Sequence, residues 1–303
     1  MCLLGRVFSR GWENEGYCYD NSMRTKVLGL PVDLVTKEEV FLILKNWVAS
    51  RTSETKMVVT AYSEFFVRAV RDPEFARILG KADLVTPDGH SVLAAAKYLR
   101  RTHELKNLKN QYHGPRVLRF IYEGLKVGGE LWSGKLGEPV TGVWLFEKIT
   151  SQAEKHNWRL FLLGGWDNVS GQAAKILLER FPNIKVAYDA GEESVGSDPT
   201  TDKRIVKKIQ DFNPDFLFVQ YRPVVQEKWI ESHRDQLAKV RVAMGIGGTL
   251  DEFVGRLKTS PNWMERHGIK WLRRLILQPS RWRRMIDAVI IFPWLVFRES
   301  LEK

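Results

Sequence analysis

Between Trp158 and Gly248 the sequence alternates four short apolar runs with three longer segments of helical periodicity. The apolar runs read "WRLFLLGG", "IKVAYDAG", "DFLFVQY" and "VRVAMGIGG", and three of them end in glycine. A helix that connects two strands in this way returns the chain to the same end of the sheet, so the strands run parallel. The pattern therefore predicts an α/β fold with a Rossmann-like parallel sheet flanked by helices.

The same alternation begins at Met23, where "KVLGLPVD" and "KMVVT" are apolar runs followed by helical patterns. We predict three parts: a poorly ordered extension at 1–22, an α/β domain at 23–260, and a helical appendage at 261–303. The domain holds a basic and aromatic insertion at about 100–138, with a helix expected around Val117 to Lys126.

The extension has neither the apolar core nor the cleavage site of a secretory signal. The two cysteines of the chain, Cys2 and Cys18, both lie in it. No disulfide framework or cysteine metal site is therefore expected in the body, which fits a reducing compartment.

The net charge of +11 is concentrated near the C-terminus, because Arg266 to Arg284 contain seven Lys or Arg and no acidic residue. Such a patch suits nucleic acid, anionic lipid or a diphosphate substrate. Residues 285–297 follow as a largely apolar run that would reach about 20 Å as a helix, against roughly 30 Å of hydrocarbon in a bilayer. A helix lying on a membrane surface is one interpretation; an apolar helix packed on the body or on a second subunit is the other.

Glycines follow three of the predicted strands, as Gly164-Gly165, Gly191 and Gly247-Gly248. In a parallel sheet a ligand binds beyond the carboxyl ends of the strands, where glycine lets a phosphate or sugar approach the backbone N–H groups. The alternative is that these glycines only permit tight strand-to-helix turns. The chain has no complete G-x-G-x-x-G, which argues against a nicotinamide or flavin enzyme.

The segment "ADLVTPDGHSVLAAAK" places Asp88-Gly89 between an apolar strand and a helix of small residues. A carboxylate at that point projects from a strand end into a cleft, where it can act as an acid or base. Pro-Asp-Gly is also a common turn, and Asp is a favoured helix N-cap, so a structural role is the alternative.

Eight ordered blocks together resemble the WecG/TagA/CpsF family of bacterial glycosyltransferases over about residues 25–284. They read "VVTAYSEFFVRAVRDPEF", "ADLVTPDG", "VTG", "FLLGG", "PDFLFV", "QEKWI", "VAMGIGGTLDEFVGRLKTSPNWM" and "WLRRLILQPSRWRR". The last two blocks are the most characteristic of that family.

The resemblance implies an inverting hexosyltransferase at the inner face of the cell membrane. Its donor would be a UDP-sugar of N-acetylmannosamine or glucosyl type, and its acceptor a polyprenyl-diphosphate-linked sugar in cell-surface polysaccharide synthesis. No metal or other cofactor is implied. Two alternatives are a catalytically degenerate member that binds UDP-sugar or membrane without turnover, and a nucleic-acid binder. The chain shows no nucleic-acid-binding motif, so we expect no such partner.

The resemblance also implies roles for individual residues. Asp88 matches the base that takes the proton from the acceptor hydroxyl, and Thr60 matches a neighbouring active-site hydroxyl. The implied substrate-binding positions are Gly89, Gly164, Gly165, Gly191, Gln226, Glu227, Gly247, Gly248 and Asp251. Taken without the family, Glu227 is also explained as an acidic residue favoured at a helix N-terminus.

In the family the C-terminal appendage folds over the active site and supplies arginines, which match Arg274, Arg281 and Arg284 here. We expect them to offset the charge of diphosphates, although Pro279 should break or kink the helix between them. On this hypothesis the apolar residues that follow rest in the headgroup region of an anionic membrane. A homo-oligomer is a further expected partner.

The sequence departs from the family at several positions. Tyr62, Pro139 and Trp144 stand where the family has Asn, Arg and Asp, so three polar contacts are expected to be lost. The family's "GLGxPKQE" reads "QYRPVVQE", and Arg222 is a candidate replacement for the lost lysine. The insertion at about 100–138 is either a second membrane-contacting element or a packed excursion.

Overall fold

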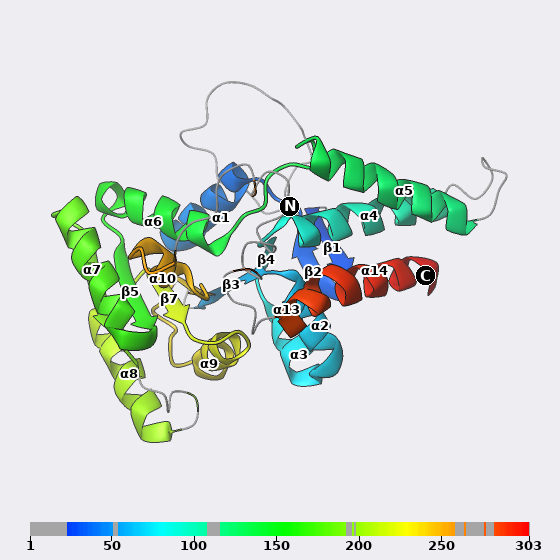
Figure 1. The fold of residues 1–303 in the computed structure, drawn as a ribbon. Helices are drawn as coiled ribbons and strands as arrows, with labels where there is room; N and C mark the ends of the chain where they lie inside the picture. The colour runs from blue at the N-terminus through cyan, green and yellow to red at the C-terminus, as the bar shows by residue number, and fades with distance from the viewer. Residues whose placement is uncertain are drawn as a thin grey trace.

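The computed structural model describes residues 23–50, 54–107, 116–191, 196, 198–257, 264, 276 and 282–302. Within them, six parallel strands form the central sheet in the order β4-β3-β8-β7-β5-β6 (Figure 1). The strands are β3 (Lys56–Ala61), β4 (Leu84–Pro87), β5 (Arg159–Gly164), β6 (Lys185–Asp189), β7 (Phe216–Gln220) and β8 (Val242–Gly245). The predicted α/β fold is thereby confirmed, and the four runs of the repeat are β5 to β8.

Helices cover both faces of the sheet, and successive residues of a strand pack into two separate hydrophobic cores. On β5, Leu160 and Leu162 pack into one core, while Phe161 and Leu163 pack into the other. The first core is covered by α1 (Lys37–Ser50), α6 (Gly142–His156) and α7 (Val169–Arg180). The second is covered by α2 (Ser63–Arg71), α3 (Pro73–Lys81), α4 (His90–Asn107), α8 (Pro199–Phe212) and α9 (Val225–His233).

The segment "KVLGLPVD" is a hairpin outside the central sheet instead of the single strand that its apolar pattern suggests. Strands β1 (Arg24–Val27) and β2 (Leu30–Asp33) pair antiparallel across a turn in which Leu28 and Gly29 have φ of 50° and 79°. Two left-handed residues give the turn type that suits a two-residue hairpin. The buried Asp33 carboxylate accepts from Arg24 Nε and from Val85 N, both at 2.7 Å, and so fastens the hairpin to β4.

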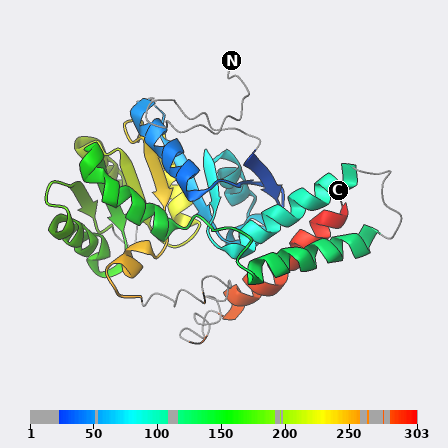
Figure 2. The ribbon, with the colours of Figure 1, turned by 90° about the horizontal axis from the view of Figure 1, so that it is seen from above.

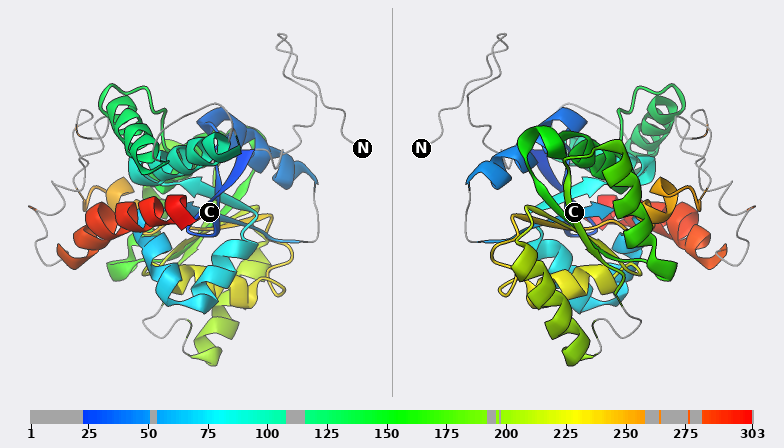
Figure 3. Two further views of the ribbon diagram at one scale, coloured as in Figure 1. Left: turned by 90° about the vertical axis from the view of Figure 1, so that its right-hand side faces the viewer. Right: turned by 90° about the vertical axis from the view of Figure 1, so that its left-hand side faces the viewer.

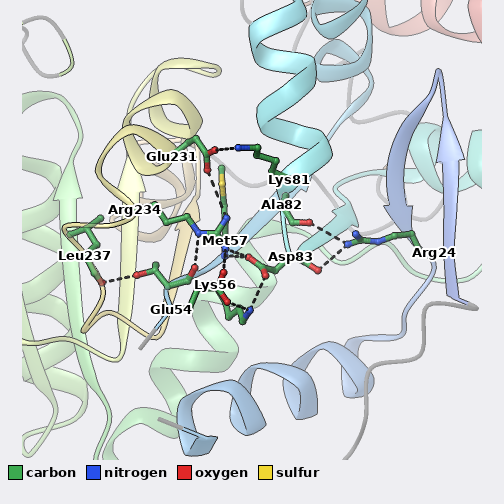
Figure 4. Close-up of polar contacts among 11 residues, drawn as sticks. Arg24, Glu54, Lys56, Met57, Lys81, Ala82, Asp83, Glu231, Arg234 and Leu237 are labelled. Atoms are coloured by element: carbon green, nitrogen blue, oxygen red, sulfur yellow. Dashed lines mark hydrogen bonds and ion pairs between the residues drawn. The ribbon is translucent and has the colours of Figure 1, made fainter. Parts of the chain in front are cut away.

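A group of charged residues ties the hairpin, β3, β4 and α9 together at the amino-terminal edge of the sheet (Figure 4). The Asp83 carboxylate accepts from Met57 N at 2.8 Å, pairs with Lys56 Nζ at 3.2 Å, and also accepts from the Arg234 guanidinium. Arg24 donates to the backbone oxygen of Asp83 at 2.9 Å. This network lies at the opposite end of the strands from the cavity described below.

The insertion contains the predicted helix, which is longer than expected. Helix α5 runs over Arg116–Trp132 and packs along α4. Together with the C-terminal helix these two form a three-helix group beside the sheet, as Figures 1 to 3 show from different sides. Along α5, Leu118, Tyr122, Leu125 and Trp132 keep 61% to 71% of their surface exposed.

Residues 282–302 form one helical rod of three consecutive parts. These are α13 (Trp282–Ile286), the π-helical turn η4 (Asp287–Ile291) and α14 (Phe292–Glu302). Pro293 has no N–H to donate and would crowd the carbonyl four residues back in a regular α-helix. The wider turn before it, in which Phe292 N donates to Asp287 O, lets the helix continue past the proline.

One side of this rod packs on the body, and the other side is exposed. Glu299 Oε2 accepts from Leu28 N at 2.6 Å, Ser300 Oγ lies 2.9 Å from Tyr98 Oη, and Phe292 packs against Phe66. On the other side Ile290 and Trp294 keep 62% and 61% of their surface exposed. Among the described residues, no helix has both the length and the apolar character needed to cross a membrane.

Candidate active site

A cavity of about 2260 Å³ lies at the carboxyl ends of the parallel strands. Because all six strands run in the same direction, the residues that follow them meet at one edge of the sheet. The cavity is lined there by Tyr62 after β3, Asp88 after β4, Gly165 after β5, Gly191 after β6, Tyr221 after β7 and Gly247 after β8.

Most of the predicted site residues line this cavity. They are Thr60, Asp88, Gly89, Gly165, Gly191, Gln226, Gly247, Gly248, Asp251 and Arg284. Gly164 and Glu227 lie directly behind it, as described below. Arg274 and Arg281 fall outside the described residues.

Asp88 continues the pairing of β4 with β3, because its backbone N donates to Ala61 O at 2.9 Å. The next helix, α4, begins at His90, and Leu93 N donates to Gly89 O at 3.3 Å. The N-cap of α4 is therefore Gly89. The alternative role of Asp88 as a helix N-cap is wrong. Asp88 is one of the residues that line the cavity.

Thr60 is nearly buried on β3 and presents its hydroxyl to the start of α6. A Cβ on Gly142 would lie 3.3 Å from Thr60 Oγ1 and 3.3 Å from Thr249 Oγ1. The glycine of the "VTG" block therefore keeps these hydroxyls close to the first turn of α6, where any side chain would press on them. Thr141 caps that helix by accepting from Trp144 N at 3.2 Å.

Tyr62, which replaces the family's Asn, also offers a polar group at this position. The expected loss of the Asn contact stays a prediction. Arg284 donates to Tyr62 Oη at 3.3 Å and, through Nε, to Glu64 Oε2 at 2.7 Å. Burial, with the Glu64 carboxylate nearby, raises the pKa of Tyr62, so the phenol stays protonated. The C-terminal helix thus places a cation over the end of β3.

Gln226 and Glu227 form a buried pair at the start of α9. Gln226 Nε2 donates to Glu227 Oε1 at 2.6 Å, and Gln226 Oε1 accepts from Gly247 N at 3.1 Å. Glu227 Oε2 accepts from Val224 N at 2.8 Å, while burial raises the pKa of its carboxyl to about 7. A Cβ on Gly245 would come within 2.4 Å of Gln226 Nε2, so any side chain there would displace this pair. The pair positions the backbone beyond β8.

The segment "QYRPVVQE", which departs from the family pattern, uses its larger residues for packing. Gln220 Nε2 donates to Asp251 Oδ2 and its Oε1 accepts from Leu250 N, both at 2.7 Å. This clamp holds α10 (Thr249–Phe253) at the cavity. Burial raises the pKa of Asp251.

Tyr221 occupies the space that the glycines at the ends of β5 and β6 leave open. A Cβ on Gly164 would lie 2.7 Å from its ring, and one on Gly191 would lie 2.3 Å from its hydroxyl oxygen. A close approach to the backbone of these glycines was expected from a ligand. In the structure the Tyr221 side chain makes it. Gly165 and Gly191 still reach the cavity, which here follows the crevice between β5 and β7. The helices after these two strands lead in opposite directions, as at the ligand-binding crevice of such sheets.

Arg222 and Lys37 are further cations that line the cavity. Within the described part of the chain, Arg222 has no carboxylate partner, whereas Lys37 pairs with Glu138. Val224, which follows in this segment, has φ of 77°, a strained value for a β-branched residue that costs about 1–3 kcal/mol.

Among the described residues there is no group of three or more His, Cys, Asp or Glu able to hold a metal ion. Metal independence stays a prediction.

Comparison with known proteins decides the family. The model described as Glycosyl transferase WecG/TagA/CpsF family matches residues 25–116 and 123–303. The chain belongs to this family. Two similar glycosyltransferases come from Staphylococcus aureus strains MRSA252 and NCTC 8325 / PS 47. Each is an N-acetylglucosaminyldiphosphoundecaprenol N-acetyl-beta-D-mannosaminyltransferase, 25% identical over 278 residues that cover 91% of this chain and 93% of the relative.

The family model matches most of the expected insertion at about 100–138 and leaves out only six residues of it. Residues 117–122, which the two matched ranges leave out, lie in the first turns of α5. This glycosyltransferase therefore departs from the family model in a helix that lines the cavity, since Phe120 and Ile121 are among the lining residues.

Proposed function

We propose that the protein transfers an N-acetylmannosamine-type sugar from a UDP-sugar to N-acetylglucosamine linked to a polyprenyl diphosphate. The observation that carries the proposal is the match over 91% of the chain to transferases of that name. The cavity supports it, because Asp88 and Arg284 both line it beyond the carboxyl ends of the strands.

In the proposed reaction Asp88 is the general base. It takes the proton of the acceptor hydroxyl while that oxygen attacks the anomeric carbon from the side opposite the leaving group. The new C–O bond forms as the bond from the anomeric carbon to the UDP phosphate oxygen breaks. The electron pair of that bond stays on the UDP. Because the acceptor oxygen attacks from the opposite side, the sugar is transferred with inversion.

The leaving UDP gains negative charge, which preorganised cations stabilise best in a site with little water. Arg284 and Arg222 are the cations of the cavity that we assign to the diphosphates of donor and acceptor. Glu64 and Tyr62 hold Arg284 by two hydrogen bonds, so its guanidinium needs little reorganisation when the substrate binds.

A second candidate is a member that binds UDP-sugar without turnover. It is favoured by the segment 220–225, where Gln220 and Tyr221 fill the crevice that the family's glycines leave open. Tight UDP binding without transfer over a wide donor panel would support this candidate.

We also propose that the protein binds peripherally to the inner face of the cell membrane. The exposed side of the C-terminal rod carries Trp282, Ile290 and Trp294, with Arg283 stacked over the Trp282 ring at 5.3 Å. Aromatic, aliphatic and basic residues together suit the interfacial region of an anionic bilayer.

The test is UDP release from a panel of UDP-sugars, with a soluble N-acetylglucosamine diphosphate lipid analogue as acceptor. Wild type should release UDP only with acceptor present, and Asp88→Asn should lower kcat by about 10²–10⁴-fold, since its amide cannot accept the proton. Asp211→Asn, on an exposed position of α8, is the matched control. An Asp88→Asn enzyme with the wild-type rate would remove Asp88 from the role of base.

A further inference from the structure

The cavity does not end at the sheet but continues as a groove between three helices. Ala94 and Ala95 of α4 form its floor, Gly124 and Gly128 of α5 form one wall, and Phe292 of the C-terminal rod lies in the other. Figure 2 shows α5 and the rod side by side next to α4. These five residues are apolar or lack a side chain, in contrast to the polar groups at the strand ends.

The glycines of α5 keep this groove open. A Cβ on Gly128 would meet nothing within 4 Å, and one on Gly124 would meet only the Tyr98 ring at 3.8 Å. Glycine inside a helix costs about 1 kcal/mol relative to alanine, and no backbone conformation demands it here. The two glycines, four residues apart on one face, therefore leave space for something other than the protein.

The rim of the groove is apolar and exposed. Leu125 and Ile121 of α5 keep 71% and 44% of their surface exposed, and Val289 of the rod keeps 39%, although all three line the cavity. Exposed apolar residues that surround a groove mark the binding site of an apolar ligand or partner.

The rod connects the apolar groove to the charged end of the cavity. Arg284, Ala288, Phe292 and Val296 follow one another at steps of four residues, and all four line the cavity. A ligand along this wall meets a cation first and then about 12 Å of apolar surface, from the helical rise between Ala288 and Val296. That sequence of groups suits an amphiphile with an anionic head and a hydrocarbon chain.

We propose that the groove between α4, α5 and the C-terminal rod binds the first isoprenoid units of the acceptor, with its diphosphate beside Arg284. The proposal rests on the proposed function, because it takes the polyprenyl diphosphate as the acceptor. The prenyl chain then contributes to recognition by direct contact with the protein, in addition to any anchorage in a bilayer.

The test uses N-acetylglucosamine diphosphates that carry a methyl group or a C5, C10 or C15 prenyl chain, without vesicles or detergent. Each buried CH₂ contributes about 0.8 kcal/mol, so partial burial of the C15 chain should lower KM at least tenfold relative to the methyl compound. Gly128→Leu fills the groove and should remove this dependence on chain length. Gly129→Leu is the matched control, since it is also open on α5 but does not line the cavity.

Binding of farnesyl diphosphate, compared with inorganic diphosphate, separates this proposal from the proposed function. Tighter binding of the farnesyl compound that Gly128→Leu abolishes and Gly129→Leu retains would support the groove even if no sugar is transferred. Equal effects of the two substitutions would overturn the proposal, as would a KM independent of chain length. A change in molecular mass in solution with Gly128→Leu alone would overturn it too, because the groove would then be an interface between copies of the chain.

Discussion

The Nε atom of Arg284 donates to Glu64 Oε2 at 2.7 Å, which joins the C-terminal rod to α2 at the edge of the cavity. The two residues are separated by most of the chain, yet Glu64 is nearly buried and also accepts from Arg68 Nε at 3.0 Å. The position of Arg284 therefore depends on the body of the protein as well as on its own helix.

Arg284→Ala should lower kcat/KM by about 10²-fold, because removing a cation that faces developing phosphate charge has effects of that size. Arg284→Lys should recover part of the loss, since it keeps the charge without the planar fork. Steady-state kinetics with the lipid-linked acceptor measure both. Arg283→Ala is the control, because Arg283 stacks on Trp282 and does not line the cavity. Equal losses in the two alanine variants would contradict the role of Arg284.

Glu227 should make the free energy of unfolding depend on pH. Its pKa is about 7 in the fold, against 4.5 for the ordinary carboxyl, so between these values the folded state keeps a proton that the unfolded state has lost. Stability from this group is fully present below about pH 4.5 and is lost as pH rises to about 7, in total about 3 kcal/mol. Urea unfolding from pH 4.5 to 8 should show this fall in wild type and a flatter profile in Glu227→Gln. Parallel profiles would contradict the prediction.

Gly142→Ala should disturb the site more than the fold. The added Cβ would press on Thr60 Oγ1 and Thr249 Oγ1 at 3.3 Å, and we expect about a tenfold loss of kcat/KM. Gly80→Ala, in α3 with open space around it, should leave the kinetics unchanged and raise stability by about 0.5–1 kcal/mol. Kinetics and thermal unfolding of the two variants test this difference, and wild-type kinetics in Gly142→Ala would argue against a tight fit at Thr60.

Asp83→Ala should destabilise the protein without changing kcat/KM. Asp83 joins Met57, Lys56 and Arg234 at the end of the strands away from the cavity (Figure 4). Loss of these partly buried contacts should cost about 2 kcal/mol, or roughly 4 °C in Tm for a chain of this size. A large loss of activity at a temperature where the variant is folded would show that the two ends of the sheet are coupled.

Ile290→Asp and Trp294→Asp should each weaken binding to vesicles of anionic phospholipid by about tenfold or more. Burying such a side chain contributes about 1.5–3 kcal/mol, and a carboxylate adds repulsion from the lipid charge. Flotation of the full chain with vesicles measures the bound fraction. Leu178→Asp is the control, because Leu178 is 48% exposed on α7, far from the rod (Figure 1). An equal effect of Leu178→Asp would place the membrane contact elsewhere.

The parallel sheet was predictable from local pattern alone. The runs that became β5, β7 and β8 are nearly continuous apolar strands, as expected where helices cover both faces, and helical segments separate the four strands of the repeat. The edge strand β6 is only partly buried. The hairpin β1-β2 was missed because its turn places Leu28, a residue with no preference for positive φ, beside Gly29. Nothing in "KVLGLPVD" marks that reversal.

The candidate site was predictable in its positions but not in its contacts. Asp88 and the glycines follow strands, so the fold alone brings them to one edge. The partners of Tyr62 and Gln220 could not be predicted in this way, because they are distant in sequence and are brought close by packing. Arg284 donates to Tyr62, and Gln220 donates to Asp251. The tight space around Gly142 was signalled only by the glycine in "VTG".

Helix α5 carries Gly124, Gly128 and Gly129 within six residues, which lowers its intrinsic helix stability by about 3 kcal/mol relative to alanine. Its helical form is therefore maintained mainly by packing of Phe120 and Val127 on the second core. Local opening of α5 should then cost much less than unfolding of the sheet, and its amide protons should exchange with solvent correspondingly faster. One wall of the groove is thus the part of the fold that can move aside while the strand ends keep their arrangement.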